Sequence, residues 1–351
     1  MPTARSLKKI GLTALFLCGF TNPALLANDY VENPLAADLI TQLVKEEGFD
    51  RAELTAWLAT AKRQESIIRA MSRPAEKVKP WYDYRKHFIS ERRIDKGVEF
   101  WQQHRDTLER AAETFSVDPN IIVAIIGVET NYGSNTGSFR VVDALTTLAF
   151  DYYINVEQRE SRQRFFTSEL KNLFLLAREQ KQDPTTLTGS YAGAMGWGQF
   201  MPSSYRAYAV DFDGDNFADI WNNPVDAIGS VASYFSRHGW ELGEPVAVRA
   251  NASEAYSGAI DKLHRPKLTV AEHSKSGFSA QQDALLNDAT LSQRKALPLS
   301  FELEQGNEYW LGLNNFYVIS RYNPRTKYAM AVYQLSELIS ARYQKQALVG
   351  Q

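Results

Sequence analysis

Residues 121–128, Ile-Ile-Val-Ala-Ile-Ile-Gly-Val, contain no polar side chain, and this run constrains the fold more than any other feature. Asp118 and Pro119 precede it and are typical of a helix cap followed by the first helical residue. A helix that is apolar on every side has to be covered on every side. The run nevertheless ends at a carboxylate, Glu129, followed by the polar and aromatic residues 130–133. The sequence therefore predicts a buried helix that presents an acid at its carboxyl end.

The apolar neighbours of Glu129 suggest what this acid does. Ile125 and Ile126 lie four and three residues before it, so they share its side of the helix. Lost hydration disfavours a charged carboxylate and raises its pKa. A carboxyl group still protonated near neutral pH suits a general acid that protonates a glycosidic oxygen. Residues 130–132 add hydrogen-bonding groups and a ring useful for sugars, and they favour this hypothesis. The alternative is that Glu129 ends a core helix and faces solvent or a basic residue.

The first 27 residues have the three-part plan of a secretory signal peptide. A basic start is followed by apolar residues 10–20 and by a small residue, Ala27, at the predicted cleavage site. The apolar part is too short for a stable membrane anchor. Cys18 is the single cysteine, and a lipid-anchored form is less favoured because Leu17 precedes it instead of a small residue. We predict an exported, periplasmic protein with no membrane span in the mature chain and no disulfide.

Charge argues against one class of partner. The full chain has a net charge of -2, and without residues 1–27 it keeps 36 basic and 41 acidic residues, a net charge of -5. Nucleic-acid binders usually show a basic face or tail, so no nucleic-acid partner is predicted. The five histidines are scattered and the mature chain would lack cysteine, so no zinc site is predicted either.

Hydrophobic periodicity predicts an α+β protein that is mainly α. Helical patterns cover 34–71, 95–115 and 162–181, another helix starts at Asn223-Pro224, and the chain returns to helix over 327–343. Between them, alternating residues predict a small β region, with strands at 246–250, 299–303, 309–311 and 316–319. The predicted division is a signal peptide (1–27), a helical region (28–85), a core (86–242), a small antiparallel β domain (243–320) and a C-terminal segment (321–351).

A second block, Gly189-Ser-Tyr-Ala-Gly-Ala-Met-Gly-Trp-Gly-Gln-Phe-Met-Pro202, places glycines among aromatic and polar residues. Glycine lets a backbone approach a ligand closely. Trp197 and Phe200 could pack on sugar faces, while Ser190 and Gln199 could bond to hydroxyl or acetamido groups. The spacing matches neither a phosphate loop nor a dinucleotide fingerprint. The alternative is a tight structural turn between helices.

Taken together, four ordered blocks resemble the bacterial lytic murein transglycosylases of the B type, glycoside hydrolase family 103. They are "GVETNYG", "GSYAGAMGWGQFMPSSY", "NPVDAIGSVASYF" and "LGLNNFYVISRYNPRTKYAMAV", and the match runs from about residue 33 to about residue 345. The resemblance implies a lysozyme-like helical core with a flanking helical domain and a small β domain. It also implies cleavage of the β-1,4 bond between N-acetylmuramic acid and N-acetylglucosamine, leaving a 1,6-anhydro end. Its partners would be peptidoglycan glycan strands and other cell-wall enzymes.

The resemblance also implies roles for single residues. Glu129 matches the family's one acid/base, and neither substrate block contains a second acid. No cofactor is expected for catalysis. The positions that match the substrate cleft are Tyr84, Arg162, Ser190, Gln199, Phe200, Tyr234, Tyr322, Asn323 and Tyr328. Beside Arg162, Ser161 departs from a family pair of arginines, and the stretch 151–160 is longer than usual.

A calcium-loop pattern begins at Asp211. Asp211, Asp213 and Asp215 occupy its positions 1, 3 and 5, and Phe217 at position 7 offers a backbone carbonyl. Asn216 stands where glycine is usual, and Asn222 stands where a glutamate would bind. The resemblance implies that Asp226 supplies the last ligand. We predict a structural calcium ion, and the alternative is a solvated acidic turn.

Two other functions remain open at this point. A muramidase would hydrolyse the same bond with water, and the shared fold and first acid separate it poorly from a transglycosylase. A non-catalytic, calcium-dependent glycan-binding protein is the alternative from a different class.

Overall fold

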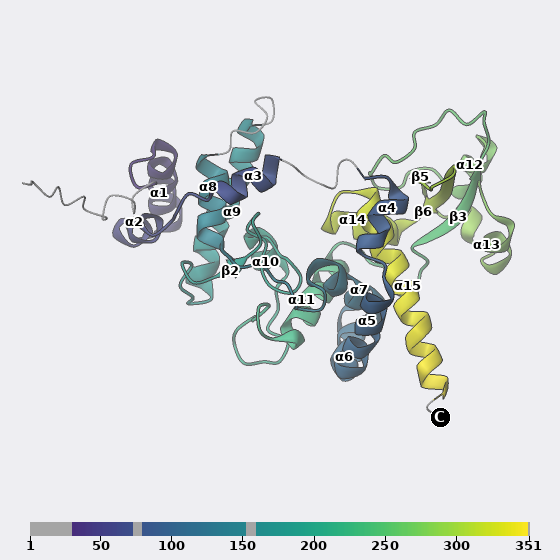
Figure 1. The fold of residues 1–351 in the computed structure, drawn as a ribbon, viewed down its shortest axis with the longest axis horizontal. Helices are drawn as coiled ribbons and strands as arrows, with labels where there is room; N and C mark the ends of the chain where they lie inside the picture. The colour runs from purple at the N-terminus through teal and green to yellow at the C-terminus, as the bar shows by residue number, and fades with distance from the viewer. Residues whose placement is uncertain (1–29, 73–78, 152–158, 350–351) are drawn as a thin grey trace, which may run out of the picture.

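The computed structural model describes residues 30–72, 79–151 and 159–349 (Figure 1). The predicted signal peptide and most of the stretch 151–160 lie outside these residues. The fold class is as predicted, because helices dominate and a small antiparallel sheet is inserted late in the chain.

The N-terminal helices pack against two later ones. These helices are α1 (Pro34–Glu47), α2 (Arg51–Ala59) and α3 (Glu65–Ser72), and they contact α8 (Val141–Phe150) and α9 (Arg159–Glu179) (Figure 1). Gly48 ends α1 in the left-handed conformation, with φ 69°. The Asp50 side chain then caps α2 by accepting the Glu53 N–H at 2.9 Å. Trp57 stacks on Phe174 with ring centres 5.4 Å apart, which ties the pair to α9.

The predicted single helix over 95–115 is wrong, because two helices cover this stretch. They are α5 (Glu91–Gln103) and α6 (Arg105–Phe115), and His104 between them has φ -114° and ψ 25°, outside the helical region. Both helices are strongly amphipathic, so the bend lets each turn its own apolar face towards the core. The short helices α4 (Trp81–Tyr84) and η3 (Arg85–His87) precede them.

The apolar run forms the central helix, α7 (Pro119–Thr130), in which every residue of 121–128 is buried. Its main contacts in the described chain are with α5, α6, α11 (Pro224–Arg237) and α15 (Thr326–Val349) (Figure 1). Asn131, Tyr132 and Gly133 then take positive φ values of 51°, 59° and 76°, which ends the helix abruptly. Glu129 therefore lies in the last turn of a helix whose preceding residues, 121–128, are all buried.

The main sheet has four antiparallel strands in the order β4-β3-β6-β5. Their bounds are β3 (Ala247–Ala252), β4 (Phe278–Ala280), β5 (Leu297–Glu302) and β6 (Asn307–Gly312). The short elements α12 (Val270–Lys275), α13 (Gln282–Asn287) and η5 (Leu291–Gln293) lie between β3 and β5. A second, two-stranded sheet pairs β1 (Phe139–Arg140) with β2 (Thr188–Gly189).

The predicted strand at 316–319 is wrong, because these residues belong to the helix α14 (Asn314–Tyr322). A short apolar run fits a buried strand and a buried helix equally well by periodicity. Phe316, Val318 and Ile319 are all buried, and α14 packs on both α15 and β6. Tertiary packing around these side chains decides for the helix.

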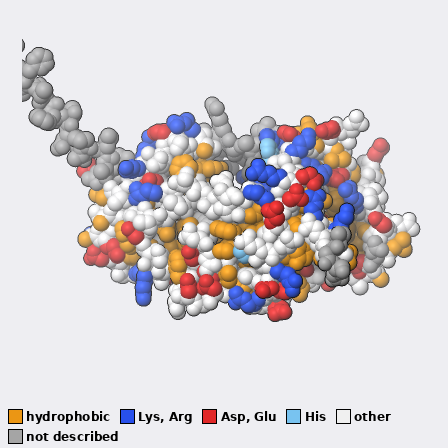
Figure 2. All heavy atoms as spheres, turned by 60° about the horizontal axis from the view of Figure 1, so that its bottom comes forward, with side chains coloured by type: hydrophobic (Ala, Val, Ile, Leu, Met, Phe, Trp, Pro, Cys, Tyr) orange, Lys and Arg blue, Asp and Glu red, His pale blue; other side chains and the backbone are white. Residues whose placement is uncertain are grey.

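The surface and the helix lengths add two observations. Basic and acidic side chains are interspersed on the face shown in Figure 2, where the described residues present no broad area of a single charge. Within the described ranges no single helix is long and apolar enough to cross a membrane, and the α6–α7 pair that passes by length and composition is bent by 114°.

Candidate active site

The carboxyl group of Glu129 lies against a tyrosine from the far end of the chain. The Tyr328 hydroxyl, in the first turn of α15, donates a hydrogen bond of 2.5 Å to Glu129 Oε1. Part of the Glu129 side chain is still open to solvent, although protein atoms surround its carboxyl group as densely as in the interior. The Glu129 side chain is therefore largely enclosed by protein and still borders solvent.

Burial raises the pKa of Glu129 to about 7, and the hydrogen bond from Tyr328 opposes the rise. Burial and, after it, the charge of Glu129 raise the pKa of Tyr84 to about 12. The same two causes raise the pKa of Tyr322 and Tyr328 well above the ordinary value. Three tyrosines therefore share the environment of this carboxyl group, and its pKa of about 7 leaves it partly protonated near neutral pH.

An aromatic cluster continues from Tyr322. Its hydroxyl donates to the Gly198 carbonyl oxygen at 2.5 Å, and its ring centre is 4.6 Å from that of Tyr234. Phe200 lies 6.0 Å from both rings. Phe200 and Tyr234 are only 2% and 6% exposed, and the Tyr234 hydroxyl donates to the Arg321 carbonyl oxygen. Their side chains hold Tyr322 in place from behind.

The glycine-rich stretch packs against the turn that follows Glu129. Gln199 has a positive φ of 52°, and its Nε2 donates to the Thr136 carbonyl oxygen at 3.0 Å. The Ser190 hydroxyl oxygen accepts the Ala194 N–H at 3.1 Å. Gly133 is needed for close approach, because a Cβ there would lie 2.5 Å from the Trp197 ring. The sequence could not predict that the Thr136 backbone carbonyl holds Gln199, because every residue has such a carbonyl and no side chain marks it.

Two residues expected to help with sugars have structural roles instead. Thr130 is buried, and its hydroxyl donates to the Trp197 carbonyl oxygen at 3.0 Å and accepts the Gly133 N–H. The Tyr132 hydroxyl donates to the Arg93 carbonyl oxygen at 2.8 Å. Both groups fasten the turn after α7, so they position Glu129 and leave sugar contacts to other residues.

Arg162 and Asn323 are not joined to Glu129 by a hydrogen bond or ion pair in the described part of the chain. The Arg162 guanidinium lies 5.2 Å from the Phe166 ring centre on α9. Asn323 ends α14, and its carbonyl oxygen accepts the Arg325 N–H at 2.7 Å. Their roles in substrate binding stay predictions.

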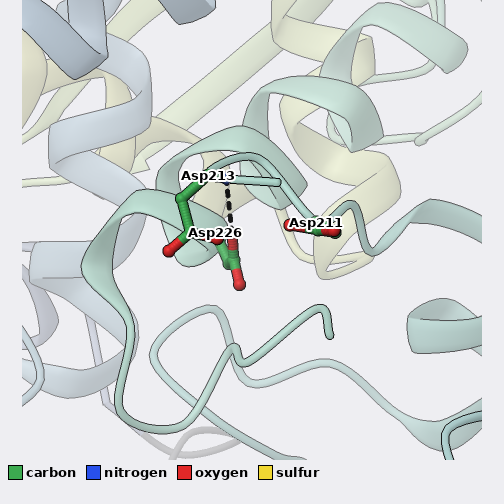
Figure 3. Close-up of side chains that lie close together, drawn as sticks. All are labelled: Asp211, Asp213 and Asp226. Carbon is green, nitrogen blue, oxygen red and sulfur yellow. Dashed lines mark hydrogen bonds between the residues drawn. The ribbon is translucent and has the colours of Figure 1, made fainter. Parts of the chain in front are cut away.

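The acidic loop brings three of the predicted metal ligands together. Asp211, Asp213 and Asp226 each offer a carboxylate oxygen, and these oxygens lie within 4.8 Å of one another (Figure 3). Such a spacing suits Ca²⁺, whose oxygen ligands lie 2.3–2.6 Å from the ion. Asn216 takes the left-handed conformation with φ 77°, as expected where glycine is usual. Asp215 and Phe217 lie outside this cluster of three.

Asp226 reaches the loop from the first turn of α11 and is 0% exposed. Its Oδ1 accepts the N–H groups of Phe212 and Asp213, and its Oδ2 accepts that of Asp219. Burial raises its pKa, and the hydrogen bond from the Phe212 N–H opposes the rise. Asn223 Nδ2 donates to Asp213 Oδ2 at 2.7 Å, which ties the residue before α11 to the loop.

Comparison with known proteins now decides the family. A model described as the transglycosylase SLT domain matches residues 32–337, most of the chain. The chain belongs to this family. It is 42% identical over 324 residues to the membrane-bound lytic murein transglycosylase B of Escherichia coli, covering 90% of this chain and 85% of that protein. It is therefore a peptidoglycan lytic transglycosylase.

Solved structures agree with the fold of this transglycosylase. The catenated lytic transglycosylase SltB1 from Pseudomonas aeruginosa has a TM-score of 0.82 at 48% identity, covering 90% of this chain and 100% of that one. An E. coli lytic transglycosylase in complex with calcium has a TM-score of 0.78 at 42% identity, covering 91% and 96%. The P. aeruginosa SltB3 in complex with NAG-NAM-pentapeptide has a TM-score of 0.73 at 29% identity, covering 86% and 78%.

Replacing Tyr328 with phenylalanine tests the electrostatics of the transglycosylase site. In the parent, the hydrogen bond from Tyr328 stabilises the charged form of Glu129 and so lowers its pKa. The variant lacks this bond, so the pKa of Glu129 should rise. The pKa of about 7 predicts an alkaline limb of the kcat/KM profile near pH 7 in the parent, and we expect this limb to move to higher pH in the variant. We also expect kcat to fall about 10–100-fold, because a bond to a charged group is worth about 1.5–3 kcal/mol. A Tyr328→Phe variant with an unmoved alkaline limb would contradict this coupling.

Proposed function

We propose that this transglycosylase cleaves the β-1,4 bond between N-acetylmuramic acid and N-acetylglucosamine and leaves a 1,6-anhydromuramic acid end. The observation that carries the proposal is the enclosed carboxyl group of Glu129, whose pKa of about 7 keeps a transferable proton near neutral pH. An ordinary surface glutamate would be ionised there and could not donate.

The proposal assigns both proton transfers to Glu129. Conventional glycosidases need two carboxylates flanking the bond. Among the described residues, no second carboxylate contributes to the pKa shift of Glu129, as the nucleophile of a retaining glycosidase at about 5 Å would. A single acid suffices if it first gives its proton and then takes one back. This is the arrangement that a transglycosylase requires.

The two proposed steps return Glu129 to its starting protonation state. The Glu129 carboxyl proton moves to the glycosidic oxygen as the bond from C1 breaks, which releases the N-acetylglucosamine end. The Tyr328 hydrogen bond stabilises the carboxylate that this transfer creates. The carboxylate then takes the proton of the C6 hydroxyl while that oxygen bonds to C1, which closes the 1,6-anhydro ring. Glu129 ends protonated, and no water is consumed.

The substrate is proposed to be a glycan strand of peptidoglycan. A relative binds NAG-NAM-pentapeptide, and tyrosine rings with exposed polar groups suit sugars, whose faces are apolar and whose rims are polar. We propose that Tyr322, Ser190 and Gln199 contact the strand, and that Tyr84, which is 3% exposed, does so through the small part of its side chain that remains open. Phe200 and Tyr234 would act through Tyr322, and Arg162 and Asn323 would lie further along the cleft.

Product analysis separates this proposal from hydrolysis by a muramidase. The transglycosylase is incubated with purified peptidoglycan, and the soluble products are weighed by mass spectrometry. Anhydro ends are lighter than reducing ends by one water molecule. Products that all end in ordinary reducing muramic acid would reject the proposed chemistry in favour of a muramidase.

A structural calcium ion is proposed for the loop at 211–226. The three clustered carboxylates would hold it, with Asp215 and the Phe217 carbonyl as the remaining predicted ligands, and a relative was crystallised with calcium. When bound, the ion would neutralise acids that otherwise repel one another. It has no part in the proton transfers.

Calcium is expected to raise the melting temperature by several degrees. An ion at about 100 times its Kd stabilises the folded state by about 2.7 kcal/mol. Differential scanning calorimetry in excess chelator and in millimolar calcium measures the shift. An Asp211→Asn variant should lose most of it, whereas Asp183→Asn, outside the loop, should keep it. An equal melting temperature in chelator and in calcium would reject the site.

Export to the periplasm is proposed from the predicted signal peptide. The named relative is membrane-bound, and peptidoglycan lies outside the inner membrane. Binding to other cell-wall enzymes stays a prediction.

A further inference from the structure

A large hollow opens beside Tyr84, between the loop after β3 and the turn from α14 to α15. Its volume is about 920 Å³, within the usual size of a ligand pocket. We call it the basic pocket. Its lining residues are Tyr84, Ala259, Asp261, Lys262, Leu263, His264, Pro324, Arg325, Thr326 and Lys327.

Positive charge dominates this pocket. Two lysines and an arginine, Lys262, Arg325 and Lys327, are among its lining residues. Among the described residues that line the pocket, Asp261 is the one acid. Its Oδ1 accepts the Ser300 N–H at 3.0 Å, so part of the carboxylate is already engaged within the protein. A pocket with this charge balance favours an anionic ligand.

The basic pocket adjoins the catalytic centre. Tyr84 lines it, and the charge of Glu129 contributes to the raised pKa of the same tyrosine. Lys327 immediately precedes Tyr328, which hydrogen-bonds Glu129. The Lys327 ammonium donates to the Lys79 carbonyl oxygen at 2.5 Å, which holds its charge at the pocket wall. An anion bound here therefore lies next to whatever occupies the site at Glu129.

We propose that the basic pocket binds the carboxylates of the peptide stem carried by the muramic acid of the substrate. This inference rests on the proposed function. In an intact strand the lactyl group is joined to the peptide through an amide and carries no charge, so the anionic groups are the free carboxylates of the stem. Aromatic contacts recognise sugar rings, whereas complementary charge selects strands that bear peptides.

The matching experiment compares peptide-bearing strands with strands from which an amidase has removed the peptides. The measured quantity is the ratio of kcat/KM for the two substrates. Lys262 is exposed on its loop, so Lys262→Glu should fold. We expect it to lower the ratio about five- to tenfold, and Arg325→Gln should lower it in the same direction. Lys267→Glu reverses an exposed lysine outside the pocket lining and should leave the ratio as in the parent.

Salt supplies a second, independent measurement on the parent enzyme. Screening weakens exposed charge pairs, so high ionic strength should lower the parent ratio towards that of Lys262→Glu. An unchanged ratio in both pocket variants would overturn the inference. An equal loss of kcat/KM on both substrates would also overturn the inference. Stripped strands carry lactyl carboxylates but no stem carboxylates, so such a loss could not come from binding the stem. Failure of the proposed function looks different, since the parent would then release no anhydro ends from either substrate.

Discussion

A Glu129→Gln variant is expected to release soluble fragments from peptidoglycan at least about 10³-fold more slowly than the parent. One general acid or base contributes about 10²–10⁴-fold, and Glu129 is proposed to serve in both steps. Glutamine keeps the size and polarity of the side chain but has no proton to give and cannot take one. Release of fragments from labelled peptidoglycan measures the rate.

Stability measurements show whether this loss comes from chemistry or from unfolding. The pKa of Glu129 is raised in the folded state, from 4.5 to about 7. Its contribution to stability is therefore full below about pH 4.5 and is lost as pH rises through about 7. At pH 8 the folded parent bears the cost of burying a charged carboxylate at Glu129. Glutamine is uncharged and has no such cost, so at pH 8 the variant should melt at the same or a higher temperature than the parent. Substantial residual activity in a folded Glu129→Gln variant would reject the assigned role.

The second large effect is expected at Asp226, on stability. Asp226→Ala removes a buried carboxylate that accepts N–H groups from Phe212, Asp213 and Asp219. A buried donor left without a partner costs about 1–3 kcal/mol, and water reaches part of this loop, so we expect a total loss of about 3 kcal/mol. Urea unfolding in excess chelator measures the loss without any contribution from calcium.

Two matched variants make the Asp226 result specific. Asp226→Asn keeps the shape and one acceptor oxygen, so it should lose less than the alanine variant in chelator. Asp215→Asn changes an exposed acid of the same loop outside the cluster of three, and it should be close to the parent in chelator. Equal stability of Asp226→Ala and the parent in chelator would show that the buried hydrogen bonds contribute nothing.

Local sequence signals predicted the helices well where helix-capping residues were followed by a helical pattern of apolar residues. Asp118-Pro119 and the apolar run correctly predicted α7, and Asn223-Pro224 correctly predicted the start of α11. They failed where a short apolar run fits two structures, as in α14, and where a helix bends without a breaker residue, as at His104. In both places contacts with distant elements decide the conformation.

For this protein, the sequence by itself determined the buried helix, the acid at its end, the acidic loop and the family. These features depend on residues close together in the chain or on ordered motifs. Only the tertiary structure decided that Tyr328, 199 positions after Glu129, donates to its carboxyl group. It alone also placed three cations beside Tyr84. Such partners come from elements that meet only in the folded chain, so the pKa of Glu129 and the charge beside its cleft depend on the packing of α15 against α7.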